Sequence, residues 1–130
     1  MKQQSILIGA VAIGGGLGSS LRYGIHMMSP ITHGPLGTLI VNLIASFLLG
    51  ALVGAVLNRS FPEWLRAGFG VGFCGGLSTM SAFAADGVFL ITDQHLVFAG
   101  VYMIVSLVGG ICFSFCGLVC GQKWAGGANQ

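Results

Sequence analysis

Charge is what this sequence has least of. Only 6% of its 130 residues are charged, and five basic and three acidic side chains give a formal net charge of +2. About a quarter of the residues are charged in a typical soluble domain. So few charges cannot cover the water-facing surface of a protein of this size, and they form no basic patch for nucleic acid. A soluble globular domain and a nucleic-acid partner are therefore excluded.

Catalytic groups are also scarce. The only acidic residues are Glu63, Asp86 and Asp93, and two of them, Glu63 and Asp93, fall in expected loops. Ser78 and Ser81 have no base in the sequence that could plausibly activate them as nucleophiles. We therefore expect that the protein is not an enzyme.

Apolar residues and glycine take the place of the missing charges. Hydrophobic residues make up 55% of the chain, the mean hydropathy is +0.92, and there are 23 glycines. A spanning helix needs about 20 apolar residues, and glycine lets such helices pack closely. We predict an all-α integral membrane protein with a single four-helix transmembrane domain over residues 1–130. The expected spans cover residues 6–25, 37–57, 65–91 and 97–120.

The third expected span does not fit a plain helix. Residues 65–91 would extend about 40 Å as a continuous helix, which is longer than the hydrocarbon core is thick. Its middle contains paired glycines and then three hydroxyl residues within four positions, at 75–81. Tilt would absorb the extra length, but we favour a helix broken near its middle, between Gly75 and Thr79. Broken backbone at membrane depth is tolerated only inside protein or beside a watery cavity.

A few polar residues lie in or beside the apolar spans. Arg22 closes the first span, where it either snorkels to the headgroups or places a fixed positive charge at the mouth of an anion pathway. Asn42 lies five residues into the second span, where its side-chain amide either forms interhelical hydrogen bonds or donates into a pore. In the fourth span, small and hydroxyl residues recur every four positions and either pack closely or line a pore. They are Tyr102, Ser106, Gly110 and Ser114.

Three segments together resemble the Fluc/CrcB family of fluoride channels, and they fall in successive spans. They are Gly15-Gly16-Leu17-Gly18 leading to Arg22-Tyr23, Pro35-Leu36-Gly37-Thr38-Leu39 running to Asn42, and Gly72-Phe73-Cys74-Gly75-Gly76-Leu77-Ser78-Thr79. The resemblance implies a passive fluoride exporter of the bacterial inner (plasma) membrane. It implies an antiparallel, dual-topology dimer with two pores, in contact with membrane lipid.

The resemblance also implies roles for individual residues. Main-chain carbonyls of Gly75 and Ser78 from both subunits would hold a structural sodium ion (Na+) at the dimer centre, and Arg22 would lie near a vestibule. The hydroxyl and amide groups of the pathway would replace the water that a small anion gives up. The expected fluoride pathway comprises Asn42, Thr79, Met80, Ser81, Phe83, Tyr102 and Ser106.

The chain departs from the family pattern inside the third span. Where the family commonly reads T-T-F-S-T-F, this chain has Met80 in place of a phenylalanine and Ala82 in place of a threonine. Met80 has no ring edge to offer an anion, although its flexible side chain can fill the space. Asp86 replaces a usual glutamate, and Gly110 stands where a further hydroxyl is expected. These changes bear on conduction and not on the fold.

The basic residues are unevenly distributed between the two expected membrane faces. Lys2, Arg59, Arg66 and Lys123 fall on the side of the tails and second loop, and only Arg22 falls on the other. Because positive segments stay cytoplasmic, this bias favours tails inside and suggests one subunit of a paralogous heterodimer with an altered or non-conducting pore. Two alternatives are a small multidrug-type transporter, which would need a carboxylate that the first span lacks, and a non-conducting structural subunit.

Overall fold

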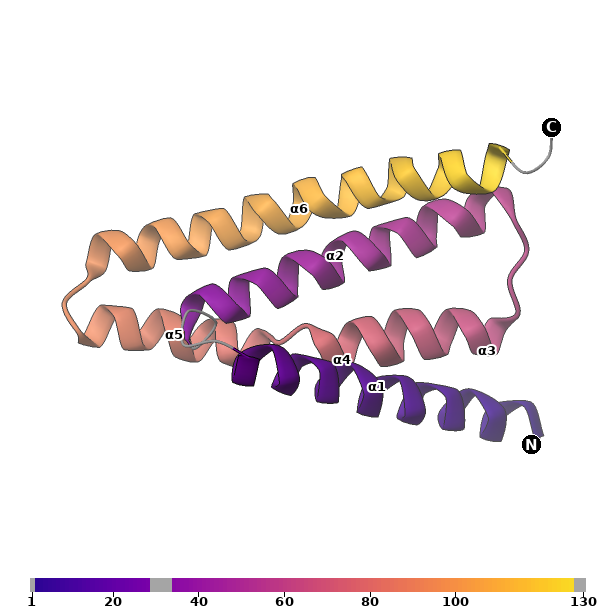
Figure 1. Ribbon diagram of the computed structural model, residues 1–130, viewed down its shortest axis with the longest axis horizontal. Helices are drawn as coiled ribbons and strands as arrows, with labels where there is room; N and C mark the ends of the chain where they lie inside the picture. The colour runs from indigo at the N-terminus through magenta and orange to yellow at the C-terminus, as the bar shows by residue number, and fades with distance from the viewer. Residues whose placement is uncertain (1, 29–33, 128–130) are drawn as a thin grey trace.

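The computed structural model describes residues 2–28 and 34–127, and all of its regular elements there are helical. Four helical segments are long and apolar enough to cross a membrane (Figure 1). They are α1 (Lys2–Met28), α2 (Pro35–Asn58), a third segment (Glu63–Thr92) and α6 (Leu96–Gly126). The prediction of four helical segments long and apolar enough to span a membrane is confirmed, and each segment exceeds its expected bounds by one to six residues at either end. The first expected connection includes residues 29–33, which lie outside the described residues.

The third segment is interrupted, as predicted. Its elements are α3 (Glu63–Arg66), the π-helical η2 (Ala67–Cys74), α4 (Gly75–Leu77) and α5 (Met80–Thr92). Ser78 and Thr79 separate α4 from α5 in extended conformation, with ψ angles of 157° and 116°. The break is narrower than expected, because Gly75 and Gly76 remain helical. A Cβ at Gly76 would overlap the carbonyl oxygen of Gly15 on α1, so this glycine permits close packing instead of ending the helix.

Glycines also set the distance between the other helices. α2 packs along α6, and a Cβ at Gly50 or Gly54 of α2 would overlap backbone carbonyl oxygens of α6. α1 packs against η2 and α4, and a Cβ at Gly14 or Gly18 would overlap carbonyl oxygens of η2. Such close backbone approach supplies van der Waals contact where the hydrophobic effect contributes little between helices in lipid.

The two ends of the molecule differ in charge. The start of α1, the end of α6 and the α2–α3 connection lie at one end, and the α5–α6 connection lies at the other (Figure 1). The basic residues of the first end are Lys2 at the start of α1, Arg59 after α2, Arg66 at the end of α3 and Lys123 in the last turn of α6. The fold therefore gathers these four cations at one end, as the sequence predicts.

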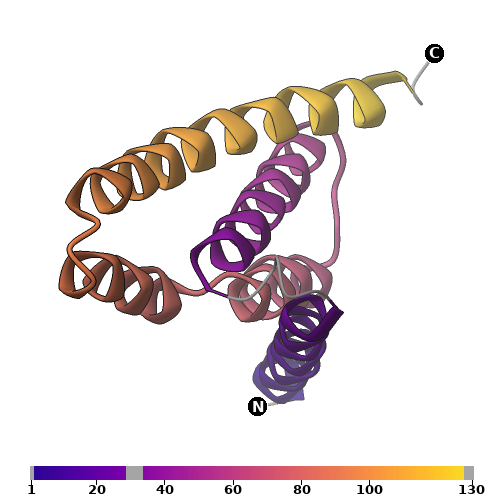
Figure 2. The same cartoon turned by 60° about the vertical axis from the view of Figure 1, so that its left-hand side comes forward.

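Few residues of the chain are buried within it. Val41, Ala45 and Leu77 form the core where α2 meets the third segment, and partly buried Leu48 and Phe73 pack against it. Figure 2 shows α1 lying against the third segment and apart from α6. Large apolar side chains are exposed along every long helix, which suits a surface that faces lipid. The chain is a multi-pass membrane protein.

Candidate functional site

Asn42 on α2 binds the backbone of the helix break. The Thr79 N–H donates to Asn42 Oδ1 at 2.7 Å, and Asn42 Nδ2 donates to the Thr79 carbonyl oxygen at 3.2 Å. The Thr79 side chain caps α5 by accepting from the Ala82 N–H at 3.2 Å. One side-chain amide therefore bonds both the N–H and the carbonyl of the residue at the break, and the second proton of the Asn42 NH₂ group remains for another acceptor.

Two side chains of α1 bind the carbonyl groups next to this peptide. Arg22 Nη1 donates to the Ser78 carbonyl oxygen at 3.1 Å, and Ser19 Oγ donates to the Gly76 carbonyl oxygen at 3.4 Å. Arg22 is half-buried and points back into the protomer, so it is not simply extended toward lipid headgroups. Because an arginine has five N–H donors and one is used here, the guanidinium keeps donors and a full positive charge for a further ligand.

A polar groove of about 680 Å³ lies beside the break. On its α5 side, Thr79 Oγ1 and Ser81 Oγ are 3.1 Å apart, so these hydroxyls form a pair at the wall. The groove contains one fixed positive charge, from Arg22, and the described lining residues include no carboxylate. The lining residues are Ser19, Arg22, Tyr23, His26, Met27, Thr79, Ser81, Ala82 and Ala85. A positive, donor-lined cavity of this kind attracts small anions.

A second polar cluster lies between α5 and α6. The rings of Phe83 and Tyr102 are 5.4 Å apart at an interplanar angle of 35°, and the Tyr102 hydroxyl donates to Asp86 Oδ2 at 3.4 Å. Ser106, one turn beyond Tyr102, has a buried hydroxyl with no hydrogen-bond partner. An unpaired buried hydroxyl is costly in a membrane, so this atom is available to a water or ion that enters between the two helices.

The predicted site residues thus form two groups, one at the groove and one between α5 and α6, and Met80 and Gly75 lie apart from both. Arg22, Thr79 and Ser81 line the groove, and Asn42 supports it. Met80 is 74% exposed on the outer face of the protomer. Gly75 is also exposed, and a Cβ there would meet no atom within 4 Å. Both residues therefore lie on the outside of the chain and not in its interior.

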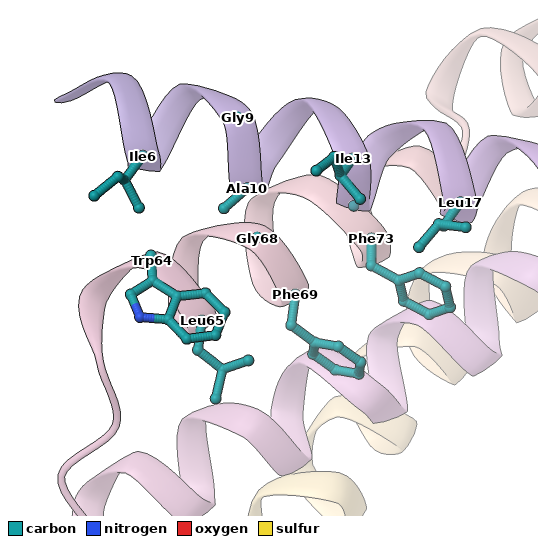
Figure 3. Close-up of a pocket in the computed structure, with 11 residues that line it drawn as sticks. Ile6, Gly9, Ala10, Ile13, Leu17, Trp64, Leu65, Gly68, Phe69 and Phe73 are labelled. Atoms are coloured by element: carbon teal, nitrogen blue, oxygen red, sulfur yellow. The ribbon is translucent and has the colours of Figure 1, made fainter. Parts of the chain in front are cut away.

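An apolar groove on the other half of α1 is a poor match for an ion. It has a volume of about 550 Å³ between α1, α3 and η2, and Figure 3 shows apolar side chains such as Ile6, Ile13 and Phe69 around it. Its described lining includes no charged side chain, and Trp64 lies at its end near the start of α3. Since an anion would find almost no donors there, the groove beside Arg22 is the candidate site.

Comparison with known proteins connects this site to a family. A family model described as "CrcB-like protein, Camphor Resistance (CrcB)" matches residues 9–118. The chain belongs to the CrcB-like family. Every predicted site residue, from Arg22 to Ser106, lies within the matched segment of this CrcB-like chain. The match favours the resemblance to the Fluc/CrcB channels over the alternative of a small multidrug-type transporter.

Individual relatives are similar over most of their length. The chain is 42% identical over 125 residues to "Fluoride-specific ion channel FluC 2" of Halalkalibacterium halodurans, covering 96% of this chain and 92% of that protein. It is 41% identical over 122 residues to the protein of the same name in Bacillus licheniformis, covering 93% and 91%. "Fluoride-specific ion channel FluC" of Ignicoccus hospitalis is 42% identical over 102 residues, covering 78% and 83%.

Sequence reasoning missed three residues of the site in this CrcB-like chain. Ser19, Tyr23 and His26 line the groove but were not among the expected pathway residues. The available signal was helical spacing, because residues 19, 22 and 26 are separated by three and then four positions and so share one face of α1. Asp86 was noticed only as a departure from the family pattern, and the structure shows it bonded to Tyr102.

Proposed function

We propose that the chain is a fluoride-selective ion channel through which cytoplasmic fluoride leaves a bacterium passively across the inner membrane. The observation that carries this proposal is the break at Ser78 and Thr79, held at membrane depth by Asn42 and Arg22 beside a polar, positively charged groove. The names of the relatives add that fluoride is the ion.

The chemistry of the groove suits a small, strongly hydrated anion. Such an ion enters only where donors replace its water at close range, and leaves only if no site binds it too tightly. The hydroxyls of Thr79 and Ser81 are neutral donors, and Arg22 supplies a single charge from a side chain that also donates to a carbonyl. The pathway would continue past Phe83 and Tyr102 to the unpaired hydroxyl of Ser106.

The functional unit that we propose is an antiparallel, dual-topology dimer with two pores. The exposure of Met80 and of Gly75 supports a partner at this face, since both residues lie on the outside of a spanning segment close to the break. Phe83 is only half-buried beside Tyr102, so a second subunit would complete the wall there.

The family resemblance implies a structural sodium ion, and the donor set at the break fits one. In a continuous helix the Thr79 N–H would bond to the carbonyl four residues earlier, that of Gly75, but here it donates to Asn42. The Gly75 carbonyl is thereby released from its helical bond, and the Ser78 carbonyl has a second lone pair beside the one used by Arg22. Carbonyls of Gly75 and Ser78 would hold the ion, which would join the subunits electrostatically.

A paralogous heterodimer is the second candidate. The gathering of Lys2, Arg59, Arg66 and Lys123 at one end favours insertion in one orientation. An antiparallel dimer would then need a second chain whose basic residues lie at the opposite end. In that dimer the pore containing Met80 would be altered or non-conducting.

Fluoride efflux from liposomes that contain this chain alone tests both candidates. Fast efflux that is selective over chloride would establish a homodimeric channel. A stable, monodisperse protein without efflux would contradict that proposal and favour a half-channel or a structural subunit. Chloride-loaded liposomes provide the control for nonspecific leak.

A further inference from the structure

The groove beside the break contains a second group that can become a cation. His26 lies in the last turn of α1, one helical turn beyond Arg22, and both side chains line the groove. The hydroxyl residues Thr79 and Ser81 line the same groove from the break and from α5. An ion in the groove would therefore meet His26 and Arg22 together with the donors of the proposed pathway.

The hydrogen bond of His26 determines which ring nitrogen exchanges a proton. Nδ1 lies 2.9 Å from the Arg22 carbonyl oxygen. Because a carbonyl only accepts hydrogen bonds, Nδ1 carries the proton in the neutral ring and Nε2 carries the lone pair. Protonation therefore adds a positive charge and a new N–H donor at Nε2 while the Nδ1 bond stays in place.

No described carboxylate in the groove would neutralise this charge. The groove-lining residues that carry a charge or titrate are Arg22, Tyr23 and His26 itself, all on α1. α2 and α4, which pack against α1, contain no titratable side chain. The titratable residues of the remaining elements around α1 lie outside the groove: Cys74 on η2, Glu63 and Arg66 on α3, and Asp86 on α5, which accepts from Tyr102. Protonated His26 would thus add to the charge of Arg22.

We propose that His26 and Arg22 form a proton-linked anion-binding site at the entrance of the pathway. With His26 neutral, Arg22 is the one cation among the described groove residues. With His26 protonated, a second charge and the Nε2 donor concentrate fluoride ahead of the hydroxyls of Thr79 and Ser81, so entry becomes faster as the pH falls. The proposal rests on the proposed fluoride conduction and adds a proton-dependent step to it.

Fluoride flux through the reconstituted chain tests the effect of pH. Flux is measured at about pH 5.5 and about pH 8, the range in which histidine changes charge, after subtraction of leak from protein-free liposomes. We expect at least about a twofold higher flux at the acidic pH. His26→Gln keeps an N–H donor for the Arg22 carbonyl but cannot gain a proton, so its flux should be equal at the two pH values. His95→Gln is the matched control, since His95 precedes α6 and lies outside the groove. If His26→Gln showed the same ratio of acidic to alkaline flux as the wild type, the proposal would be overturned.

A binding measurement separates this inference from the proposed channel activity. The ring signals of His26, assigned with the Gln variant, are titrated by NMR in detergent with and without potassium fluoride. Binding to the protonated form requires that fluoride move the His26 titration midpoint to higher pH and leave that of His95 unchanged. An unmoved midpoint contradicts the proposal even if the chain conducts. Absence of flux at both pH values would refute the proposed channel activity. The shift of the His26 titration midpoint would still show whether fluoride binds at this site.

Discussion

Asn42 and Thr79 make a reciprocal pair of hydrogen bonds across two spanning segments, with the Asn42 amide bonded to both the N–H and the carbonyl of Thr79. An unsatisfied backbone polar group costs several kcal/mol in a membrane, so this pair stabilises the interruption of the third segment there. The same pair redirects the Thr79 N–H away from the Gly75 carbonyl. The Asn42 side chain thus both stabilises the break and frees the Gly75 carbonyl from its helical hydrogen bond.

Asn42→Asp tests the role of this amide in the pathway. The carboxylate can still accept from the Thr79 N–H, but it loses the bond to the Thr79 carbonyl and places a negative charge beside the groove. We expect fluoride flux to fall about tenfold or more. Asn58→Asp is the matched control, because Asn58 on the same helix donates to the Gln122 carbonyl at 2.9 Å, far from the break. Equal flux in the two variants would show that Asn42 is not part of the pathway.

Arg22→Gln tests the charge of the groove. The variant removes the cation and replaces the charged donor to the Ser78 carbonyl by a shorter, neutral amide, and a charged hydrogen bond of this kind contributes about 1.5–3 kcal/mol. We expect lower flux and a lower melting temperature in detergent. Arg59→Gln should leave flux unchanged, since Arg59 lies over the Trp124 ring at 5.2 Å at the far end of the molecule. Wild-type flux in Arg22→Gln would contradict a vestibule at this residue.

The double variant Met80→Phe with Ala82→Thr restores the common family residues. Because Met80 is 74% exposed, a phenylalanine ring there meets no obstacle within the protomer. We expect unchanged assembly, and flux that is maintained or raised, since a ring edge and a hydroxyl donor are regained. Val88→Phe, at another exposed position of α5, serves as control. Loss of flux in an otherwise active channel would show that the pore is adapted to Met80.

A pair of alanine substitutions on α1 tests the close helix packing. A Cβ at Gly18 would overlap the Phe73 carbonyl oxygen, whereas a Cβ at Gly16 meets nothing within 4 Å. Gly18→Ala should therefore lose about 1–3 kcal/mol of stability, and Gly16→Ala should gain up to about 1 kcal/mol from helix propensity. Thermal unfolding in detergent measures both. Equal melting temperatures would show that α1 does not approach η2 so closely.

Gly75→Leu tests the proposed sodium site and the dimer. Open space around Gly75 in the protomer means that the side chain should not impair folding of one chain, but it would obstruct a second subunit at this face. We expect reduced dimer yield by light scattering, and loss of any stabilisation by Na+ relative to a large organic cation. Gly100→Leu on α6, another position with open space, is the control. Wild-type dimer yield would count against a central ion at Gly75.

Sequence reasoning located the break within a few residues but not its cause. Paired glycines were read as part of the interruption, yet Gly75 and Gly76 are helical and Gly76 packs on Gly15. Helix propensity does not report which backbone a glycine will meet, because that depends on where the neighbouring helix runs. Gly14 with Gly18 and Gly50 with Gly54 show the contrasting case, since four-residue spacing of small residues is typical of helix contacts in membranes.

Composition and order along the chain were enough to determine the membrane class, the four spans and the end at which Lys2, Arg59, Arg66 and Lys123 gather. These properties follow from local hydrophobicity and from the alternating direction of successive spans. Only the tertiary structure brought Arg22 to the Ser78 carbonyl, Asn42 to Thr79 and His26 to the groove. The reason is physical: a freed peptide group takes its partner from whichever helix lies beside it, and residues 37 to 56 positions apart become neighbours only through packing.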